Sequence, residues 1–137
     1  MSTASRQTVF RAPKGRVLLV EDTFDLRSLL RLALEGEGYE VLEAEDGVAA
    51  VEVALRERPD AIIMDMSLPR LGGDQAAKLI RREPSLSRVP VIACTALNRW
   101  EWRGKSIVAG CDAFVTKPID FDQLRQVLAQ LLARRAS

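Results

Sequence analysis

Five short apolar runs divide the chain, and each has the length and composition of a buried β-strand. They cover residues 16–20, 40–44, 61–64, 91–94 and 113–115, and the run at 40–44 is the weakest. Between the runs, apolar residues recur at every third or fourth position, which is typical of amphipathic helices. The pattern therefore predicts strands that alternate with helices over most of the chain.

The ends of the predicted helices carry recognisable signals. Asp46 can cap one helix, and Asp120 with Gln123 forms a capping-box-like pair at the start of the last one. Pro84 ends another helix, and the helix over 97–109 has the weakest pattern of the set. Strands that alternate with helices favour a parallel sheet with right-handed crossovers and helices on both faces.

Size and charge limit the organisation of the protein. The chain has 137 residues, which suits one domain with one core. Its 20 basic and 19 acidic side chains give a net charge of +1, so there is no charge footprint for nucleic acid or an anionic membrane. We predict a flexible basic arm at 1–15, a domain at 16–134 and a tail at 135–137.

Targeting segments and disulfides are not expected. No run approaches the ~20 apolar residues of a membrane span, and the N-terminus lacks the apolar stretch of a signal peptide. Cys94 and Cys111 lie beside apolar strand residues and are too few for a disulfide framework. We therefore expect a soluble, cytoplasmic protein with reduced cysteines.

Polar residues with useful chemistry stand where the predicted strands end. Glu21 and Asp22 follow the first run, Asp65 follows the third, Thr95 follows the fourth and Lys117 comes shortly after the fifth. Each of them alone has an ordinary explanation, such as a turn, a cap or a surface charge. Open α/β sheets, however, bind ligands at the carboxyl ends of their strands. The shared position predicts one acidic pocket with a lysine at its rim.

Such a pocket suits phosphoryl transfer. This chemistry needs an oxygen nucleophile, a divalent cation and donors for the phosphoryl oxygens. Asp65 would be the nucleophile and form an aspartyl phosphate. Asp22 would bind Mg²⁺ directly and Glu21 through water, because this ion prefers oxygen ligands and keeps several waters.

Beyond this pocket, residues 16–134 resemble the receiver domain of bacterial two-component response regulators. The matching motifs stand in the order and at the spacing of that family: VED at 20–22, IIMDMSLP at 62–69, TA at 95–96 and KP at 117–118. The resemblance implies an α/β fold with a flavodoxin-like, doubly wound, five-stranded parallel sheet of order 2-1-3-4-5. The chemotaxis member of the family is a standard example of that order.

The resemblance also implies a reaction and its residues. Asp65 would accept a phosphoryl group from a sensor histidine kinase or a histidine phosphotransfer protein. Mg²⁺ would contact Asp22, Asp65 and the main-chain carbonyl of Ser67. Lys117 would pair with one phosphoryl oxygen, and Thr95 would donate a hydrogen bond to another.

A conformational switch follows from the same resemblance. Thr95 would move toward the phosphate, and Phe114 would turn inward into the vacated space. The alternative is that Phe114 is an ordinary core residue of its strand. The family further suggests a cis peptide bond between Lys117 and Pro118, against the base rate of about 5% for such bonds.

Trp100 and Trp102 depart from the family pattern. Because residues two apart do not share a helix face, at least one of them should be exposed if this stretch is helical. Tryptophan is enriched at binding hot spots. The pair could contact a downstream protein target, or a second copy in a two-fold homodimer, on the face formed by the fourth helix, the fifth strand and the last helix. Packing against the arm or a neighbouring helix is the alternative.

These expectations describe a single-domain response regulator, acting as a diffusible output or as a phosphorelay intermediate. Its only reactions would be self-phosphorylation and slow self-dephosphorylation. An aspartate-nucleophile phosphatase of the haloacid dehalogenase type is an alternative, but such enzymes usually carry a second aspartate where this chain has Ser67. A pseudo-receiver that only binds partners would need a broken acidic pocket.

Overall fold

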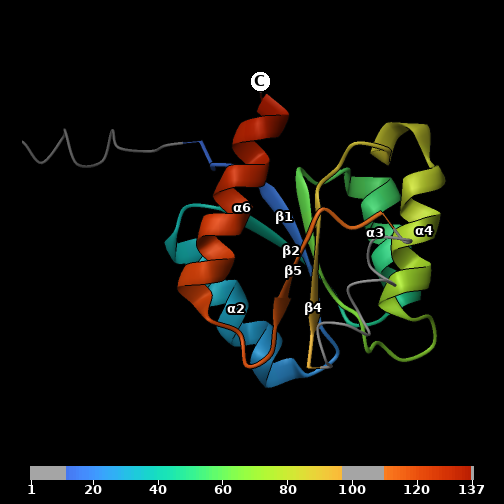
Figure 1. Cartoon of the computed structure of the whole chain (residues 1–137), viewed down its shortest axis with the longest axis horizontal. Helices are drawn as coiled ribbons and strands as arrows, with labels where there is room; N and C mark the ends of the chain where they lie inside the picture. The colour runs from blue at the N-terminus through green and yellow to red at the C-terminus, as the bar shows by residue number, and fades with distance from the viewer. Residues whose placement is uncertain (1–11, 97–109, 137) are drawn as a thin grey trace, which may run out of the picture.

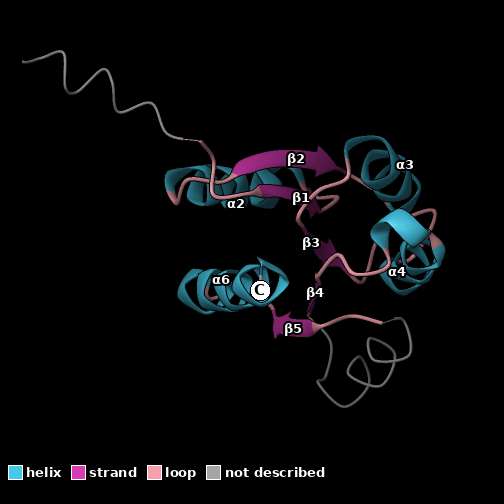
Figure 2. Cartoon of the chain, turned by 90° about the horizontal axis from the view of Figure 1, so that it is seen from above, coloured by secondary structure: helices cyan, strands magenta, loops and turns pink. Residues whose placement is uncertain are grey.

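The computed structural model of the chain describes residues 12–96 and 110–136. In this part of the chain, five parallel strands form one sheet (Figure 1). Their order is β2-β1-β3-β4-β5, as predicted, and can be followed in Figure 2. The strands are β1 (Arg16–Val20), β2 (Glu40–Ala44), β3 (Ala61–Asp65), β4 (Val91–Thr95) and β5 (Ala113–Thr116).

Helices cover both faces of this sheet. The described ones are α2 (Phe24–Gly36), α3 (Gly47–Glu57), α4 (Gly73–Arg82), the short 3₁₀ helix η1 (Pro84–Leu86) and α6 (Phe121–Ala136). Figure 2 shows α2 and α6 on one face and α3 and α4 on the other. The predicted helix at 97–109, with Trp100 and Trp102, lies outside the described residues.

The side chains of the central strands alternate between two cores, one on each face of the sheet. Val17 and Leu19 of β1 pack with residues of α2 and α6, whereas Leu18 and Val20 pack with residues of α3 and α4. Every residue of β3 and β4 is buried. Burial on both faces explains why these strands are continuous apolar runs in the sequence.

The strands extend beyond the apolar runs that predicted them. β3, β4 and β5 each continue for one residue, to Asp65, Thr95 and Thr116. The apolar pattern stops where side chains reach the rim of the sheet, while the backbone pairing continues. Two of the predicted site residues are therefore held by the sheet itself.

The predicted caps of two helices are present. Asp46 Oδ1 accepts a hydrogen bond from the backbone N–H of Ala49 at 2.8 Å, which caps α3. Asp120 Oδ1 accepts one from the backbone N–H of Gln123 at 3.3 Å at the start of α6. Caps of this kind contribute about 1 kcal/mol each. α6 continues to Ala136, two residues past the predicted domain end at 134.

Part of the predicted N-terminal arm is described and contacts the domain. Lys14 donates its backbone N–H to the carbonyl of Gly38 at 2.9 Å, and its ammonium lies 5.8 Å from the centroid of the Tyr39 ring. Residues 1–11 lie outside the described residues, so the arm at 1–15 stays a prediction.

The two cysteines are free, as expected for reduced residues. Cys94 is buried in β4 and Cys111 is half-buried. Burial, with a smaller contribution from the charge of Asp65, raises the pKa of the Cys94 thiol to about 12. That thiol is therefore protonated and unreactive at neutral pH.

Candidate functional site

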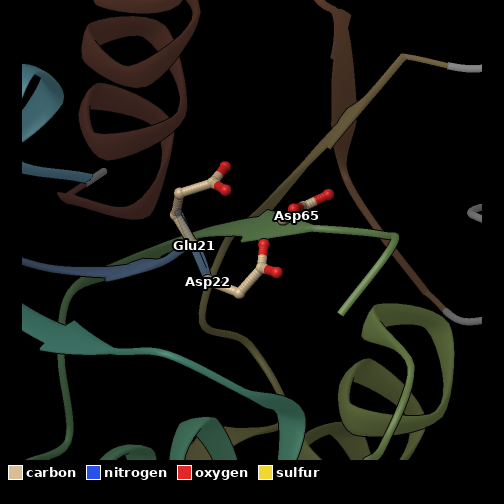
Figure 3. Close-up of side chains that lie close together, drawn as sticks. All are labelled: Glu21, Asp22 and Asp65. Carbon is tan, nitrogen blue, oxygen red and sulfur yellow. The ribbon is translucent and has the colours of Figure 1, made fainter. Parts of the chain in front are cut away.

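Three carboxylates converge at the carboxyl edge of the sheet (Figure 3). Glu21 and Asp22 directly follow β1, and Asp65 is the last residue of the adjacent strand β3. One oxygen atom from each side chain lies within 4.8 Å of the other two. Glu21 and Asp65 are only 2% and 3% exposed, whereas Asp22 is exposed. The cluster therefore opens to solvent at Asp22.

Strand register explains why these residues meet. Val20 of β1 is opposite Met64 of β3, so the next residues, Glu21 and Asp65, emerge side by side. Asp65 is in turn opposite Cys94 of β4. In parallel strands the carboxyl ends share one edge, so segments distant in the sequence deliver their polar residues to one place.

Lys117 closes the cluster from the side of β5. Its ammonium donates to Glu21 Oε1 at 3.0 Å and to Asp65 Oδ2 at 3.3 Å. Burial acts to lower the pKa of Lys117, but the hydrogen bond to Glu21 and the negative charges of Asp65 and Glu21 outweigh it and raise that pKa overall. The ammonium therefore stays charged at neutral pH.

The chain around Lys117 is also fixed. Its backbone N–H donates to the carbonyl of Thr95 at 2.8 Å, and the peptide bond to Pro118 is cis, as the family resemblance predicted.

Two of the three carboxylates have hydrogen-bond donors on both oxygens, and Asp22 is the exception among the described residues. Glu21 Oε2 accepts a hydrogen bond from the backbone N–H of Thr23 at 3.1 Å, so both of its oxygens have donors. Asp65 Oδ1 accepts one from the backbone N–H of Ser67 at 3.0 Å, and Oδ2 faces Lys117. Asp22 has no hydrogen bond to any described residue. Its carboxylate is the one most available to a cation.

Arg27 is a site residue that the sequence analysis missed. Its guanidinium donates to the backbone carbonyl of Glu21 at 2.8 Å and to Glu43 Oε1 at 2.9 Å. It thereby ties the loop that carries the acidic pair to strand β2. The sequence signal was available: Arg27 lies at helical spacing from Leu30 and Leu34, on the inward side of α2 where a charge is unexpected.

The loop after β3 is held by close backbone approaches that only glycine permits. A Cβ atom at Gly47 would lie 2.0 Å from the carbonyl oxygen of Leu71, and one at Gly73 would lie 2.3 Å from the carbonyl oxygen of Asp65. These contacts fix the two ends of the loop that contains Ser67. The carbonyl of Ser67, the predicted metal ligand, is therefore on a constrained segment.

Of the remaining predicted residues, Thr95 lies at the same edge, Phe114 lies within β5, and the two tryptophans lie outside the described part. Thr95 is fully buried at the end of β4. Phe114 is half-buried in β5 and packs against the core under α3 and α4. Trp100 and Trp102 lie outside the described residues. The roles of all these residues stay predictions.

The cluster suits a magnesium ion, because its donor atoms are hard carboxylate oxygens from three side chains close together. The half-buried ammonium of Lys117 pairs with two of these acids, Glu21 and Asp65. The pocket lies at the carboxyl edge of a parallel α/β sheet, which is where open sheets of this class bind their ligands.

Comparison with known proteins identifies the family. The response regulator receiver domain matches residues 17–129, and the chain belongs to this family. Receiver domains are signalling domains for which Mg²⁺ binding and phosphorylation are general properties, and they interact with histidine kinases and downstream targets. In the described part of the chain, no helix has both the length and the apolar character needed to cross a membrane.

The relatives that match the chain include one of nearly the same length and two that are about twice as long. The polar-differentiation response regulator DivK of Brucella anthropi is 32% identical over 120 residues, which are 88% of this chain and 97% of DivK. The transcriptional regulator RpaA of Synechocystis is 30% identical over 87% of this chain, and the response regulator MprA of Mycobacterium leprae is 34% identical over 87%. The chain spans about half the length of RpaA and of MprA, 49% and 51%.

Solved structures agree with this assignment. The receiver domain of sensor histidine kinase PA1611 from Pseudomonas aeruginosa superposes with a TM-score of 0.82 at 35% identity, over 87% of this chain and 98% of that one. That structure holds a magnesium ion in its active site cleft. The chemotaxis response regulator CheY4 of Vibrio cholerae gives a TM-score of 0.80 at 28% identity, over 85% and 97%.

Proposed function

We propose that the protein accepts a phosphoryl group on Asp65 from a histidine kinase or a histidine phosphotransfer protein, with Mg²⁺ bound, and passes the signal to a partner protein. The observation that carries this proposal is the position of Asp65. It is buried at the end of β3, 3.3 Å from the ammonium of Lys117, in a cluster of three carboxylates.

The reaction transfers one phosphoryl group between two side chains. An oxygen of the Asp65 carboxylate attacks the phosphorus of a phosphohistidine, the O–P bond forms, and the P–N bond to the imidazole breaks. Lys117 then pairs with a phosphoryl oxygen, and the Thr95 hydroxyl donates to another. Both residues are already at the rim, since β4 pairs with β3, β5 pairs with β4, and all three strands end at the same edge of the sheet.

A metal ion would be held by Asp22, Asp65 and the carbonyl of Ser67, with Glu21 acting through water. When bound, Mg²⁺ neutralises negative charge of the carboxylates and of the phosphoryl group. Asp22 is suited to direct contact, because it is exposed and has no hydrogen bond to the described residues. Glu21 is suited to an indirect role, because both of its oxygens already accept hydrogen bonds.

The surface beside the site is suited to a protein donor. Phe24, Leu29 and Leu32 of α2 are 67%, 66% and 65% exposed, and α2 begins two residues after Asp22. A phosphohistidine can reach Asp65 only if its protein covers the rim of the pocket. We therefore place the donor on α2, where apolar side chains gain from burial.

A single charged substitution tests this docking face. Leu32→Asp should slow transfer from a phosphorylated histidine kinase, chosen because it labels the wild type, by about tenfold or more. Labelling by acetyl phosphate should stay unchanged, because that small donor needs no protein surface. Equal loss with both donors would contradict the assignment of the face.

Direct phosphorylation tests the proposed function. The protein is incubated with Mg²⁺ and acetyl phosphate, and its intact mass is measured. One acid-stable, base-labile phosphoryl group should appear on the wild type and on Asp122→Asn, whose carboxylate is 80% exposed on α6. It should not appear on Asp65→Asn. Sustained hydrolysis over many turnovers would instead indicate a phosphatase, and absence of any label would indicate a pseudo-receiver.

The output is proposed to follow the predicted switch. Movement of Thr95 toward the phosphate would let Phe114 turn inward and change the face that includes β5 and α6. A phosphate favours that arrangement only through contacts which the other state lacks. Copurification with and without beryllium fluoride would show whether the changed face recruits a second copy, a target protein or a further phosphotransfer protein.

A further inference from the structure

A second, separate cavity of about 320 Å³ opens at the amino edge of the sheet. Its described lining comes from the starts of β4 and β5 and the last turns of α6: Arg88, Pro90, Asp112, Leu131, Arg134 and Arg135. β4 runs from this end of the sheet to the acidic cluster at the other end. A strand of this length spans roughly 13 Å, so the two places do not overlap.

The cavity has an excess of positive charge. Three guanidinium groups line it against a single carboxylate, that of Asp112. Asp112 Oδ2 already accepts hydrogen bonds from Arg81 at 2.6 Å and from the backbone N–H of Val91 at 2.8 Å. Arg81 is not part of the lining, so the charge of Asp112 is balanced from outside the cavity.

The three arginines of the lining are not equally engaged. Arg135 donates to the backbone carbonyl of Asp60 at 2.5 Å and lies 3.8 Å from the carboxylate of that residue, so its guanidinium is anchored. Arg88 and Arg134 are exposed and have no hydrogen bond or ion pair with any described residue. Two cations thus face one cavity without a balancing group.

Helix electrostatics account for only part of this arrangement. Cations in the last turn of α6 complement the negative end of the helix, which explains Arg134 and Arg135. Arg88 belongs to the segment between η1 and β4, and no helix end requires it there. Its presence in the same lining adds a positive charge to those of α6, and an anion in the cavity would offset their repulsion.

We propose that this cavity binds a small phosphate-bearing anion, with a diphosphate as the simplest form. Guanidinium groups present forked donors that match phosphate oxygens. Pro90 and Leu131 are buried and form an apolar wall on one side of the cavity. Water can therefore approach a bound anion only from the open side. The volume falls within the range of small-molecule sites, roughly 300–1,000 Å³.

Titration with inorganic pyrophosphate tests the site. The full chain is studied by ¹⁵N-resolved NMR in buffer with EDTA, because without a divalent cation the acidic cluster repels anions. Saturable shifts should appear at Asp112, Leu131 and Arg134. The double variant Arg88→Gln, Arg134→Gln should bind about tenfold more weakly or worse. Arg82→Gln, which removes an exposed arginine of α4 outside the lining, should bind within about twofold of the wild type.

Three results would overturn the proposal: no saturable shift, an unchanged affinity in the double variant, or an equal loss in Arg82→Gln. The replaced side chains are exposed, and unchanged thermal unfolding would show that the double variant is folded. A nucleoside diphosphate in a parallel titration distinguishes an organic ligand, which should bind more tightly than pyrophosphate, from the inorganic anion. Asp65→Asn should bind pyrophosphate as the wild type does, because the site is independent of phosphorylation.

Discussion

The two edges of the sheet are both rich in charge, but they arrange it differently. At the amino edge, acids are matched by arginines: Arg16 bonds Glu57 at 2.7 Å, and Arg81 bonds Asp112 at 2.6 Å. At the carboxyl edge, three carboxylates lie close together, and the ammonium of Lys117 pairs with two of them, Glu21 and Asp65. Paired charges hold segments together, whereas an excess of one sign binds ions. The comparison indicates that the paired charges of the amino edge stabilise the fold, whereas the carboxyl edge is suited to the proposed chemistry.

Substitution of Arg81 should have the largest effect of the predictions that test this comparison between the two edges, and the effect should be on the stability of the fold. Its guanidinium donates to the carbonyls of Val89 at 2.6 Å and Gly110 at 2.9 Å as well as to Asp112, so it joins α4 to the starts of β4 and β5. Arg81→Met keeps much of the side-chain volume but leaves these acceptors without their donor. We expect the free energy of unfolding to fall by about 3 kcal/mol in urea denaturation.

The matched control is Arg82→Met, which changes an exposed neighbour and should alter stability by less than about 0.5 kcal/mol. The affinity of folded Arg81→Met for Mg²⁺ should remain within about twofold of wild type, since the two edges act separately. A parallel loss of metal affinity would show that the division between the edges is wrong.

Asp22→Asn, at the carboxyl edge, should affect Mg²⁺ affinity rather than stability, the reverse of Arg81→Met. Removal of the most available carboxylate should weaken Mg²⁺ binding by about 100-fold in calorimetric titration. Without metal, the free energy of unfolding should be unchanged or higher, because one of three crowded negative charges is gone. Asp122→Asn on α6 serves as the control and should change neither quantity. Lower stability in metal-free Asp22→Asn would mean that this carboxylate is structural.

Some of this architecture follows from local pattern and some does not. The apolar run AIIM before Asp65 and the run before Glu21 predicted both strands and their shared edge, because parallel strands buried on two faces are continuously apolar. The hydrogen bond from Lys117 to Glu21 joins residues 96 positions apart. Spacing along the sequence carries no information about that bond, and only the assembled register of the sheet determines it.

The partners of positioning residues do not follow from the sequence pattern, even where the residue itself stands out. Arg27 is a single polar residue on the inward side of an amphipathic helix. Its role in holding the loop after β1 depends on the position of the Glu21 carbonyl in the folded protein. The tight contact of Gly47 with Leu71 likewise depends on two loops meeting in space. The predicted helix at 97–109 and the role of Trp100 and Trp102 are outside the described residues and stay predictions.

Substitution of Arg27 should have a smaller effect on Mg²⁺ affinity than Asp22→Asn. It tests the comparison between the edges because Arg27 forms an ion pair with Glu43 yet lies beside the acidic cluster of the carboxyl edge. Arg27→Met removes the donor that fixes the carbonyl of Glu21 and so loosens the loop that carries Asp22. We expect the affinity for Mg²⁺ to fall about tenfold in calorimetry, the range found for residues that orient metal ligands. Arg27→Lys should recover part of it. Unchanged metal affinity in the methionine variant, together with lower stability, would make Arg27 purely structural.

Glu43 should give the smallest effect, and it separates the two contacts of Arg27. Burial acts to raise the pKa of Glu43, but hydrogen bonds from Arg31 and Arg27 outweigh it and lower that pKa below its ordinary value of 4.5. A lowered pKa means that the ion pairs stabilise the fold above pH 4.5, and that this stabilisation is lost as the pH falls through the lower folded-state value. Because Glu43 is partly exposed, the loss should stay within about 1 kcal/mol.

The measurement compares the free energy of unfolding of the wild type and Glu43→Gln between neutral and acidic pH. The wild type should be the more stable at neutral pH, and the difference should shrink below pH 4.5. Since Arg27 keeps its bond to the carbonyl of Glu21 in Glu43→Gln, the loss of Mg²⁺ affinity should be smaller than in Arg27→Met. An equal loss in both variants would show that the pair with Glu43, rather than the direct bond to the loop, positions the metal ligands.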